Sequence, residues 1–266
     1  MAKKPNRYEK LIEKIFFNHW KEGSNAFEFA RDEMTKLAAE LNIELPKNLG
    51  DILYSFRHRN ALPASIISTQ PVGLEWIILG AGRARYRFRL ARATRIVPSE
   101  SLMSIAIPDA TPEMIRKHTL DDEQALLAIL RYNRLIDTFL GLTTYSLQNH
   151  LRTAVKDVGQ IEIDELYVGL DKYGSHYVIP VQAKVKKDQI GVVQISQDLS
   201  FAEWRFPKLR CRPVAAQFMA GNVVALFELA LIEDDQAIEV KVVEERHYRL
   251  VPAKELDDQK ISVYRQ

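Results

Sequence analysis

Hydrophobic residues with helical spacing open the chain. From Tyr8 to Trp20 and from Phe27 to Leu41, apolar residues recur every three or four positions, which predicts two amphipathic helices. A shorter apolar stripe from Leu49 to Phe56 follows Asn48, a residue type that caps helix N-termini, and predicts a third helix. The residues flanking this helix are expected to face water: Lys47, Arg57, His58 and Arg59.

A stretch with strict alternation follows the three predicted helices. Leu74 to Leu79 predicts a strand, Gly80 to Gly82 a turn, and from Arg83 the chain alternates with period two. One face carries Ala84, Tyr86, Phe88 and Leu90, and the other carries Arg83, Arg85, Arg87 and Arg89. Three helices followed by a β-hairpin is the order of a winged helix, in which the arginine face would lie along phosphates.

Charge is divided unevenly along the chain. The 266 residues carry a net charge of +2, but residues 1–97 hold 17 Lys and Arg against 10 Asp and Glu, and the remainder holds 20 against 25. From Ile52 to Val97 there are eight arginines and one acid, Glu75, although a solvated face normally mixes both signs. This segment is therefore predicted to bind nucleic acid, and a basic surface with another purpose is the alternative.

Pro98 and Ser99 break the alternating pattern and mark a domain boundary. Helical spacing predicts a helix from Asp121 to Leu140 and a second from Thr143 to Lys156. Three segments are expected: a winged-helix-like DNA-binding domain over 1–97, a helical connector over 98–142 and a second domain over 143–266.

A predicted β-hairpin further along carries polar residues at one end only. Glu162 and Asp164 alternate with isoleucines on one strand, and Gln182 and Lys184 alternate with small apolar residues on the other. With a three-residue loop, Lys172-Tyr173-Gly174, the numbers of paired residues sum to 346. Asp164 then lies opposite Gln182 and Glu162 opposite Lys184, whereas a loop one residue longer or shorter would send the pairs to opposite faces.

Such a set of side chains suits the hydrolysis of a phosphodiester. The reaction needs positive charge against the phosphate and a hydroxide-like nucleophile, and a Mg²⁺ ion supplies both through a few hard oxygen ligands. Asp164, the amide oxygen of Gln182 and the backbone oxygen of Ala183 are the expected ligands. Lys184 is expected to orient the attacking water and stabilise the phosphate. A structural salt bridge between Glu162 and Lys184 is the alternative.

The residues Gly-Gln-Ile-Glu-Ile-Asp, followed by a β-turn and Val-Gln-Ala-Lys, resemble the PD-(D/E)xK nuclease superfamily, and the Gln-x-Lys variant resembles Mrr-like enzymes that restrict modified DNA. The resemblance covers about residues 143–231. It implies an α/β (α+β) fold with a restriction-endonuclease-like αβββαβ core and a mixed sheet, in which a helix up to Trp204 follows the hairpin. It also implies metal ligands at Asp164 and Gln182 and a catalytic lysine at Lys184.

Three departures from that pattern stand in the sequence. Gln182 replaces the usual acid and removes a negative charge, for which Glu162 would compensate. Pro180 has no amide hydrogen, which predicts that the return strand is an edge or is interrupted there. In the family, the helix before the hairpin often carries a glutamate. The helix predicted here from Thr143 to Lys156 has none and offers only Gln148, Asn149 and His150. The literal Pro108-Asp109 lies in a turn-rich segment, 73 residues before Gln182, and is not expected in the site.

Together these features predict a Mg²⁺-dependent DNA endonuclease, in the simplest case a restriction enzyme. Cutting both strands of double-stranded DNA needs two sites, so a homodimer is expected. The expected DNA contacts are Arg57, Arg59, Arg83, Arg85, Arg87, Arg89, Lys186 and Lys187. Two alternatives stay open: a DNA-binding regulator with a catalytically silent nuclease-like domain, and a repair or junction-specific nuclease.

Other classes of protein find no support in the sequence. No run approaches the roughly 18 apolar residues of a membrane span, and no apolar signal region follows the N-terminus, so a cytoplasmic protein is expected. The single cysteine, Cys211, excludes an internal disulfide and a cysteine-cluster zinc site. The histidines lack zinc spacing, and no phosphate-loop pattern for a nucleotide cofactor occurs.

Overall fold

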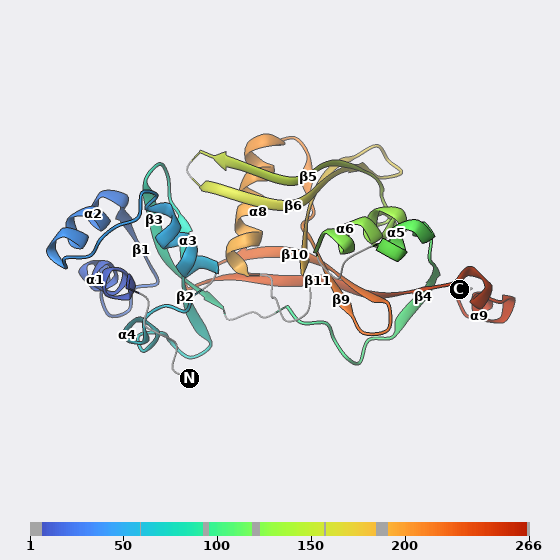
Figure 1. The fold of residues 1–266 in the computed structure, drawn as a ribbon, viewed down its shortest axis with the longest axis horizontal. Helices are drawn as coiled ribbons and strands as arrows, with labels where there is room; N and C mark the ends of the chain where they lie inside the picture. The colour runs from blue at the N-terminus through green and yellow to red at the C-terminus, as the bar shows by residue number, and fades with distance from the viewer. Residues whose placement is uncertain are drawn as a thin grey trace. The chain divides into compact units, whose positions relative to one another are not determined.

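The computed structural model describes residues 7–58, 60–92, 96–118, 123–156, 158–184 and 191–264. The protein is a mixed α/β protein with a large mixed sheet (Figure 1). Its chain forms two compact units: an N-terminal unit of residues 1–94, 154–160 and 231–240, and a C-terminal unit of residues 95–153, 161–230 and 241–266. Among the described residues, no helix has both the length and the apolar character needed to cross a membrane.

Helices and a small antiparallel sheet make up the N-terminal unit. Its main elements are α1 (Glu9–His19), β1 (Ala26–Ala30), α2 (Arg31–Glu40), α3 (Gly50–His58), α4 (Ala64–Ile67), β2 (Leu74–Gly80) and β3 (Arg85–Arg92). Strand β3 pairs antiparallel with β1 and with β2. The apolar stripes of the helices and the apolar face of β3 enclose one core, in which Phe16, Phe29 and Phe88 are buried.

Strand β1 stands where the sequence predicted the start of a helix. The predicted helix over Phe27–Leu41 is helical only over Arg31–Glu40, and Ala26–Ala30 is extended. Because β1 pairs with β3 from Ala26 opposite Arg89 to Ala30 opposite Arg85, ladder hydrogen bonds outweigh the local helical period.

In the C-terminal unit, helices and strands come in runs along the chain. After β4 (Ser104–Pro108) the chain forms α5 (Glu113–His118), α6 (Glu123–Tyr132), α7 (Leu135–Leu140), β5 (Thr143–Val155), β6 (Gly159–Leu170), β7 (His176–Lys184), α8 (Val192–Arg205), β8 (Arg210–Cys211), β9 (Val214–Met219), β10 (Val223–Glu233), β11 (Ile238–Val251), a 3-10 turn (Ala253–Glu255) and α9 (Asp258–Ser262). The strand order is β11-β10-β9-β7-β6-β5, with β4 beside β11 and β8 beside β7. The residues of the expected 98–142 connector belong to this unit.

Strand β7 is covered on both of its faces. Leu126 and Leu130 of α6 pack in one core with Val181 and Ala183, the odd-numbered side of β7. Gln182, on the other side, is bonded to α8. Because β9 pairs parallel with β7, the strand is also interior to the sheet.

Pro180 in β7 was expected at an edge or an interruption of the strand. The prediction of an edge strand is wrong, because β7 has a neighbouring strand on each side. Pro180 itself lies opposite Leu166 of β6. On the side of β7 away from β6, the strand pairing is interrupted. The β8 pairs end at Val178, and the β9 pairs begin at Val181.

Two predicted helices differ in the structure. The helix predicted from Asp121 to Leu140 is divided into α6 and α7 at Arg134, whose φ of 48° is left-handed. The helix predicted from Thr143 to Lys156 is strand β5, because pairing with β6 outweighs the four-residue spacing of its leucines. By contrast, the predicted helix after the hairpin is confirmed as α8.

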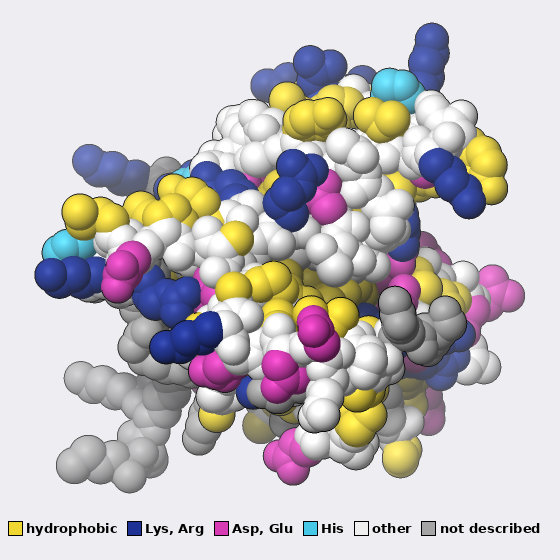
Figure 2. Space-filling view, turned by 90° about the vertical axis from the view of Figure 1, so that its right-hand side faces the viewer, with side chains coloured by type: hydrophobic (Ala, Val, Ile, Leu, Met, Phe, Trp, Pro, Cys, Tyr) yellow, Lys and Arg dark blue, Asp and Glu magenta, His cyan; other side chains and the backbone are white. Residues whose placement is uncertain are grey.

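Charged side chains of both signs share the face of the molecule drawn in Figure 2, together with exposed hydrophobic side chains. Within the described part of the chain, exposed large hydrophobic residues occur in many elements, from Phe17 in α1 to Val243 in β11. The division of charge along the sequence is therefore not repeated as a surface of one sign on this face.

Candidate active site

The hairpin of β6 and β7 has the predicted register. Its ladder runs from Leu170 opposite His176 to Glu165 opposite Val181, so the paired numbers sum to 346. Gly174 in the turn has a φ of 81°, the left-handed conformation that the three-residue loop requires. The register prediction is therefore confirmed over this ladder.

The polar residues follow where this ladder ends. Asp164, 8% exposed, accepts a hydrogen bond at Oδ2 from the backbone amide of Ala183 at 2.8 Å. Gln182, 1% exposed, donates from Nε2 to the backbone oxygen of Glu162 at 3.2 Å. Since the N–H and C=O of a residue in an extended strand point to the same side, the carbonyl of Ala183 also faces β6. The three predicted metal ligands thus lie together.

Lys184 pairs with an acid that no sequence motif had selected. Its Nζ lies 3.3 Å from Oε1 of Glu123, the first described residue of α6, and the two side chains are 14% and 38% exposed. In the sequence, Glu123 is an acid near the start of a predicted helix. Acids are common there because they interact favourably with the helix dipole, so the position alone indicates no chemistry. α6 therefore supplies a glutamate to the group, whereas the predicted helix over Thr143–Lys156 does not exist.

The carboxylate of Glu162 is engaged outside this group. Its Oε1 accepts a hydrogen bond from Nη2 of Arg152 at 2.9 Å and lies 3.7 Å from Nε2 of His150. The alternative of a structural salt bridge from Glu162 to Lys184 is therefore wrong, because each residue has another partner. The charge of Glu162 still acts on the group, since it adds to the raised pKa of Asp164, and the compensation by Glu162 for the missing acid stays a prediction.

Asp198 is the second member of the group that the sequence did not indicate. It lies on α8 and is fully buried, and its two carboxylate oxygens are 3.0 and 3.2 Å from Nε2 of Gln182. In the sequence Asp198 looks like an ordinary helical acid, since polar residues surround it. Only the packing of α8 against β7 shows that it is an interior charge.

Burial raises the pKa of two carboxyl groups here. For Asp164, burial is the largest cause, Lys184 opposes it, and the negative charge of Glu123 adds to it. The pKa of Asp198 is raised well above its ordinary range, again by burial, and the charge of Asp164 adds to the effect. Because the two carboxylates disfavour each other's ionisation, positive charge placed near them is stabilised.

The donors of this group are hard oxygen atoms: the carboxylate of Asp164 and the carbonyls of Gln182 and Ala183. In the part of the chain that the structure describes, no three His, Cys, Asp or Glu side chains gather in a way that would hold a metal ion. A cation here would rest on one carboxylate, two neutral oxygens and water. Mg²⁺ accepts such a set, because it keeps several waters and binds phosphate oxygens of the substrate.

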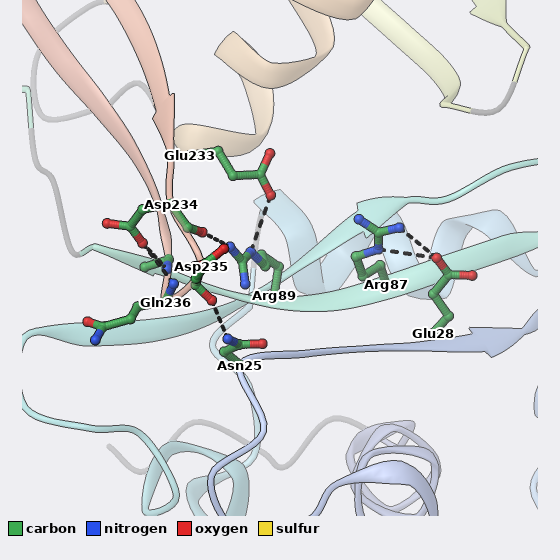
Figure 3. A network of polar contacts seen from close by, with 9 residues as sticks. Asn25, Glu28, Arg87, Arg89, Glu233, Asp234, Asp235 and Gln236 are labelled. Carbon is green, nitrogen blue, oxygen red and sulfur yellow. Dashed lines mark hydrogen bonds and ion pairs between the residues drawn. The ribbon is translucent and has the colours of Figure 1, made fainter.

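Some of the predicted nucleic-acid contacts are exposed. Arg83 and Arg85 lie on the surface beside the turn between β2 and β3. Arg87 is also exposed, but its Nη2 is 2.7 Å from Oε1 of Glu28 on β1 (Figure 3), and this hydrogen bond lowers the pKa of Glu28. Three further predicted contacts lie outside the described residues: Arg59, Lys186 and Lys187.

Arg57 and Arg89 do not face water as predicted. Arg89 is 6% exposed, donates to the backbone oxygen of Asp234, and has its Nε 3.5 Å from Oε1 of Glu233 (Figure 3). The guanidinium of Arg57 lies over the ring of Tyr86, 5.5 Å from its centroid. Its Nε and Nη2 are buried without a hydrogen-bond partner among the described residues, and burial lowers its pKa to about 10. The turn after β10 and the packing of α3 on β3 bury these two arginines.

Comparison with known proteins gives no match: no family model, no curated protein and no solved structure is similar to this chain.

Proposed function

We propose that the protein is a Mg²⁺-dependent endonuclease that hydrolyses phosphodiester bonds of double-stranded DNA. The observation that supports this most directly is the convergence of Asp164, Gln182 and Lys184 at one end of a hairpin. The elements around them are α6 and α7, then β5, β6 and β7, then α8, and then β8 and β9. With the α6–α7 pair and the β8–β9 pair each counted as one element, this order supports the αβββαβ core of the PD-(D/E)xK nucleases that the sequence motif resembles.

Each residue has a chemical role in this proposal. Asp164 and the carbonyl oxygens of Gln182 and Ala183 hold the cation. A bound Mg²⁺ supplies positive charge against the phosphate and makes water a better nucleophile. Lys184 donates hydrogen bonds to the attacking water and to the phosphate, whose negative charge increases in the transition state. Glu123 holds the ammonium of Lys184 in place.

The N-terminal unit is the proposed DNA-binding part. Helices α1, α2 and α3 precede the β2–β3 hairpin, the order that the winged-helix interpretation requires. Arg83 and Arg85 are exposed at the hairpin and would contact phosphates without reading sequence. Because Arg89 is buried, fewer arginines of β3 are available for phosphate contacts than the alternation along β3 indicated. Cutting both strands requires a homodimer.

A DNA-binding regulator with a silent second domain is the alternative proposal. It is favoured by the small number of acids: no group of three metal-binding side chains is found within the described residues. Under this alternative, the contacts of Lys184 and Gln182 only stabilise the unit. A cleavage measurement separates the two proposals.

Supercoiled plasmid incubated with the purified protein tests the function. We expect nicked and linear products with Mg²⁺ and none with EDTA. Asp164→Ala and Lys184→Ala should each lower the rate about 100-fold or more, because the first removes the carboxylate that holds the cation and the second removes the positive charge that acts on the phosphate. Glu113→Gln, an exposed acid of α5, is the control and should cut at the wild-type rate.

Two results would count against this assignment. If Asp164→Ala and Lys184→Ala, purified in the same way, cut as fast as the wild type, the site lies elsewhere. If the wild type binds duplex DNA but does not cut it at any Mg²⁺ concentration, the regulator is favoured. Parallel reactions on methylated plasmid and on branched DNA would show which class of nuclease is present.

A further inference from the structure

The side-chain amide of Gln182 is held at its nitrogen by two acceptors. Nε2 donates to the carboxylate of Asp198, at 3.0 and 3.2 Å from its two oxygens, and to the backbone oxygen of Glu162 at 3.2 Å. An amide nitrogen carries two hydrogens, so both are used. Turning the amide over would place oxygen against oxygen at both contacts. The carbonyl oxygen of Gln182 therefore points away from Asp198.

The same contacts explain why a glutamine, and not an acid, stands at position 182. A glutamate has the same shape, but when ionised it offers only acceptors. It would face the carboxylate of Asp198 with no hydrogen between them. Both positions are buried, at 1% and 0% exposure, and two unscreened like charges so close together are strongly unfavourable. An acid at position 182 would therefore destabilise the fold beside Asp198, because one of the two carboxyl groups would have to keep its proton.

We infer that Asp198 is a positioning residue of the proposed site. Its side chain orients the amide of Gln182, so that the carbonyl oxygen is presented for a cation. The inference rests on the proposed function, since it gives Asp198 a role in holding Mg²⁺.

Three variants separate this role from simple packing. Gln182→Glu sets two carboxylates against each other, and Asp198→Asn removes the charge while keeping the shape. The double variant Gln182→Glu with Asp198→Asn exchanges the two groups and restores the contact between one carboxylate and one amide, but not the hydrogen bond to the backbone oxygen of Glu162. Asp258→Asn, an exposed acid of α9, is the matched control.

Thermal unfolding of the full-length chain in EDTA tests the pairing without any metal. We expect Gln182→Glu to melt at least about 5 °C below the wild type, and the double variant to recover part of this loss, because the repulsion at position 198 is removed while the hydrogen bond to the Glu162 backbone oxygen is not restored. If Gln182→Glu melts like the wild type, or if the double variant melts no higher than Gln182→Glu, the two residues are not coupled and the inference is overturned.

Calorimetric titration with Mn²⁺ tests the positioning. Asp198→Asn should weaken Mn²⁺ binding about 10- to 100-fold, as loss of an outer partner of a metal ligand does, and the double variant should bind at least as tightly as the wild type. An unchanged Mn²⁺ affinity in Asp198→Asn would leave Asp198 a packing residue and overturn the role. If the melting pattern appears but the wild type neither binds Mn²⁺ nor cuts DNA, the proposed function fails while the Gln182–Asp198 coupling stands.

Discussion

The ammonium of Lys184 lies 3.3 Å from the carboxylate of Glu123, 61 positions earlier in the chain. Lys184 ends β7 and Glu123 begins α6, so the packing of a helix against a strand brings them together. The contact joins a residue that a sequence motif indicated to one that no motif indicated. Under the proposed function, Glu123 orients the cation that acts on the phosphate.

Replacing Glu123 by glutamine tests this role. We expect Glu123→Gln to lower the rate of plasmid cleavage about 10- to 100-fold, because Lys184 loses the charge that orients it. Stability should change by less than about 1 kcal/mol, since the Glu123 side chain is 38% exposed and solvent screens the pair. Glu113→Gln serves again as control, and an equal loss of rate in both variants would contradict the role.

The exposed arginines at the β2–β3 turn should contribute to DNA binding through salt-dependent contacts. Arg83→Ala and Arg85→Ala should each weaken binding of any duplex and reduce the slope of log affinity against log salt by about 1. Fluorescence anisotropy with a labelled duplex at several salt concentrations measures this. Arg249→Ala, an exposed arginine of β11, is the control. A slope unchanged by both test substitutions would argue against this surface.

Arg89 should matter for stability instead. Arg89→Ala leaves the backbone oxygen of Asp234 without its charged donor and should cost about 1.5–3 kcal/mol of unfolding free energy. The partner Glu233 is 57% exposed, so that ion pair adds little. Arg85→Ala, on the same face of β3, should change stability by less than about 0.5 kcal/mol. Urea unfolding that gives equal stability for the two variants would contradict this difference.

Gly80 is required by a close backbone approach. A Cβ atom there would lie 1.9 Å from the backbone oxygen of Val158, so the strand or its neighbour would have to move. Gly80→Ala should therefore lower the unfolding free energy by at least about 2 kcal/mol. Gly191→Ala is a matched control, because no atom lies within 4 Å of its added Cβ and its φ is −97°. Urea unfolding of both variants checks the difference.

Burial raises the pKa of the Cys211 thiol to about 12, and the charge of Asp198 adds to the effect. At pH 8 the folded protein then holds about 10⁻⁴ of the thiol as thiolate, against about a quarter in an unfolded chain with a pKa of about 8.5. Iodoacetamide should label native Cys211 about 1,000-fold more slowly than the urea-unfolded protein. Cys211 is the only cysteine, so mass spectrometry reports on it alone.

The same pKa sets a direction for stability at high pH. The folded state keeps the thiol proton where the unfolded state releases it, so the stabilisation is complete below about pH 8.5 and is lost as pH rises toward 12. Cys211→Ala should remove this part of the pH dependence. Native labelling as fast as labelling in urea would contradict both expectations.

Charge was the feature that local sequence described least well. The eight arginines from Ile52 to Val97 predicted a continuous cationic face. In the structure, Glu28 and the turn that contains Asp234 lie against the arginines of β3 (Figure 3). These acids are distant in the sequence, and charges interact according to their separation in space. A count within one segment cannot include them.

The register of the β6–β7 hairpin, and with it the meeting of Asp164 and Gln182, followed from the sequence alone, because a three-residue turn and strict alternation are local properties of the backbone. Tertiary packing decided that Glu123 and Asp198 join them and that Thr143–Val155 is a strand. The physical reason is the same in each case. Helix packing and strand pairing are chosen by surfaces that meet only after folding, and no local pattern encodes which surfaces those are.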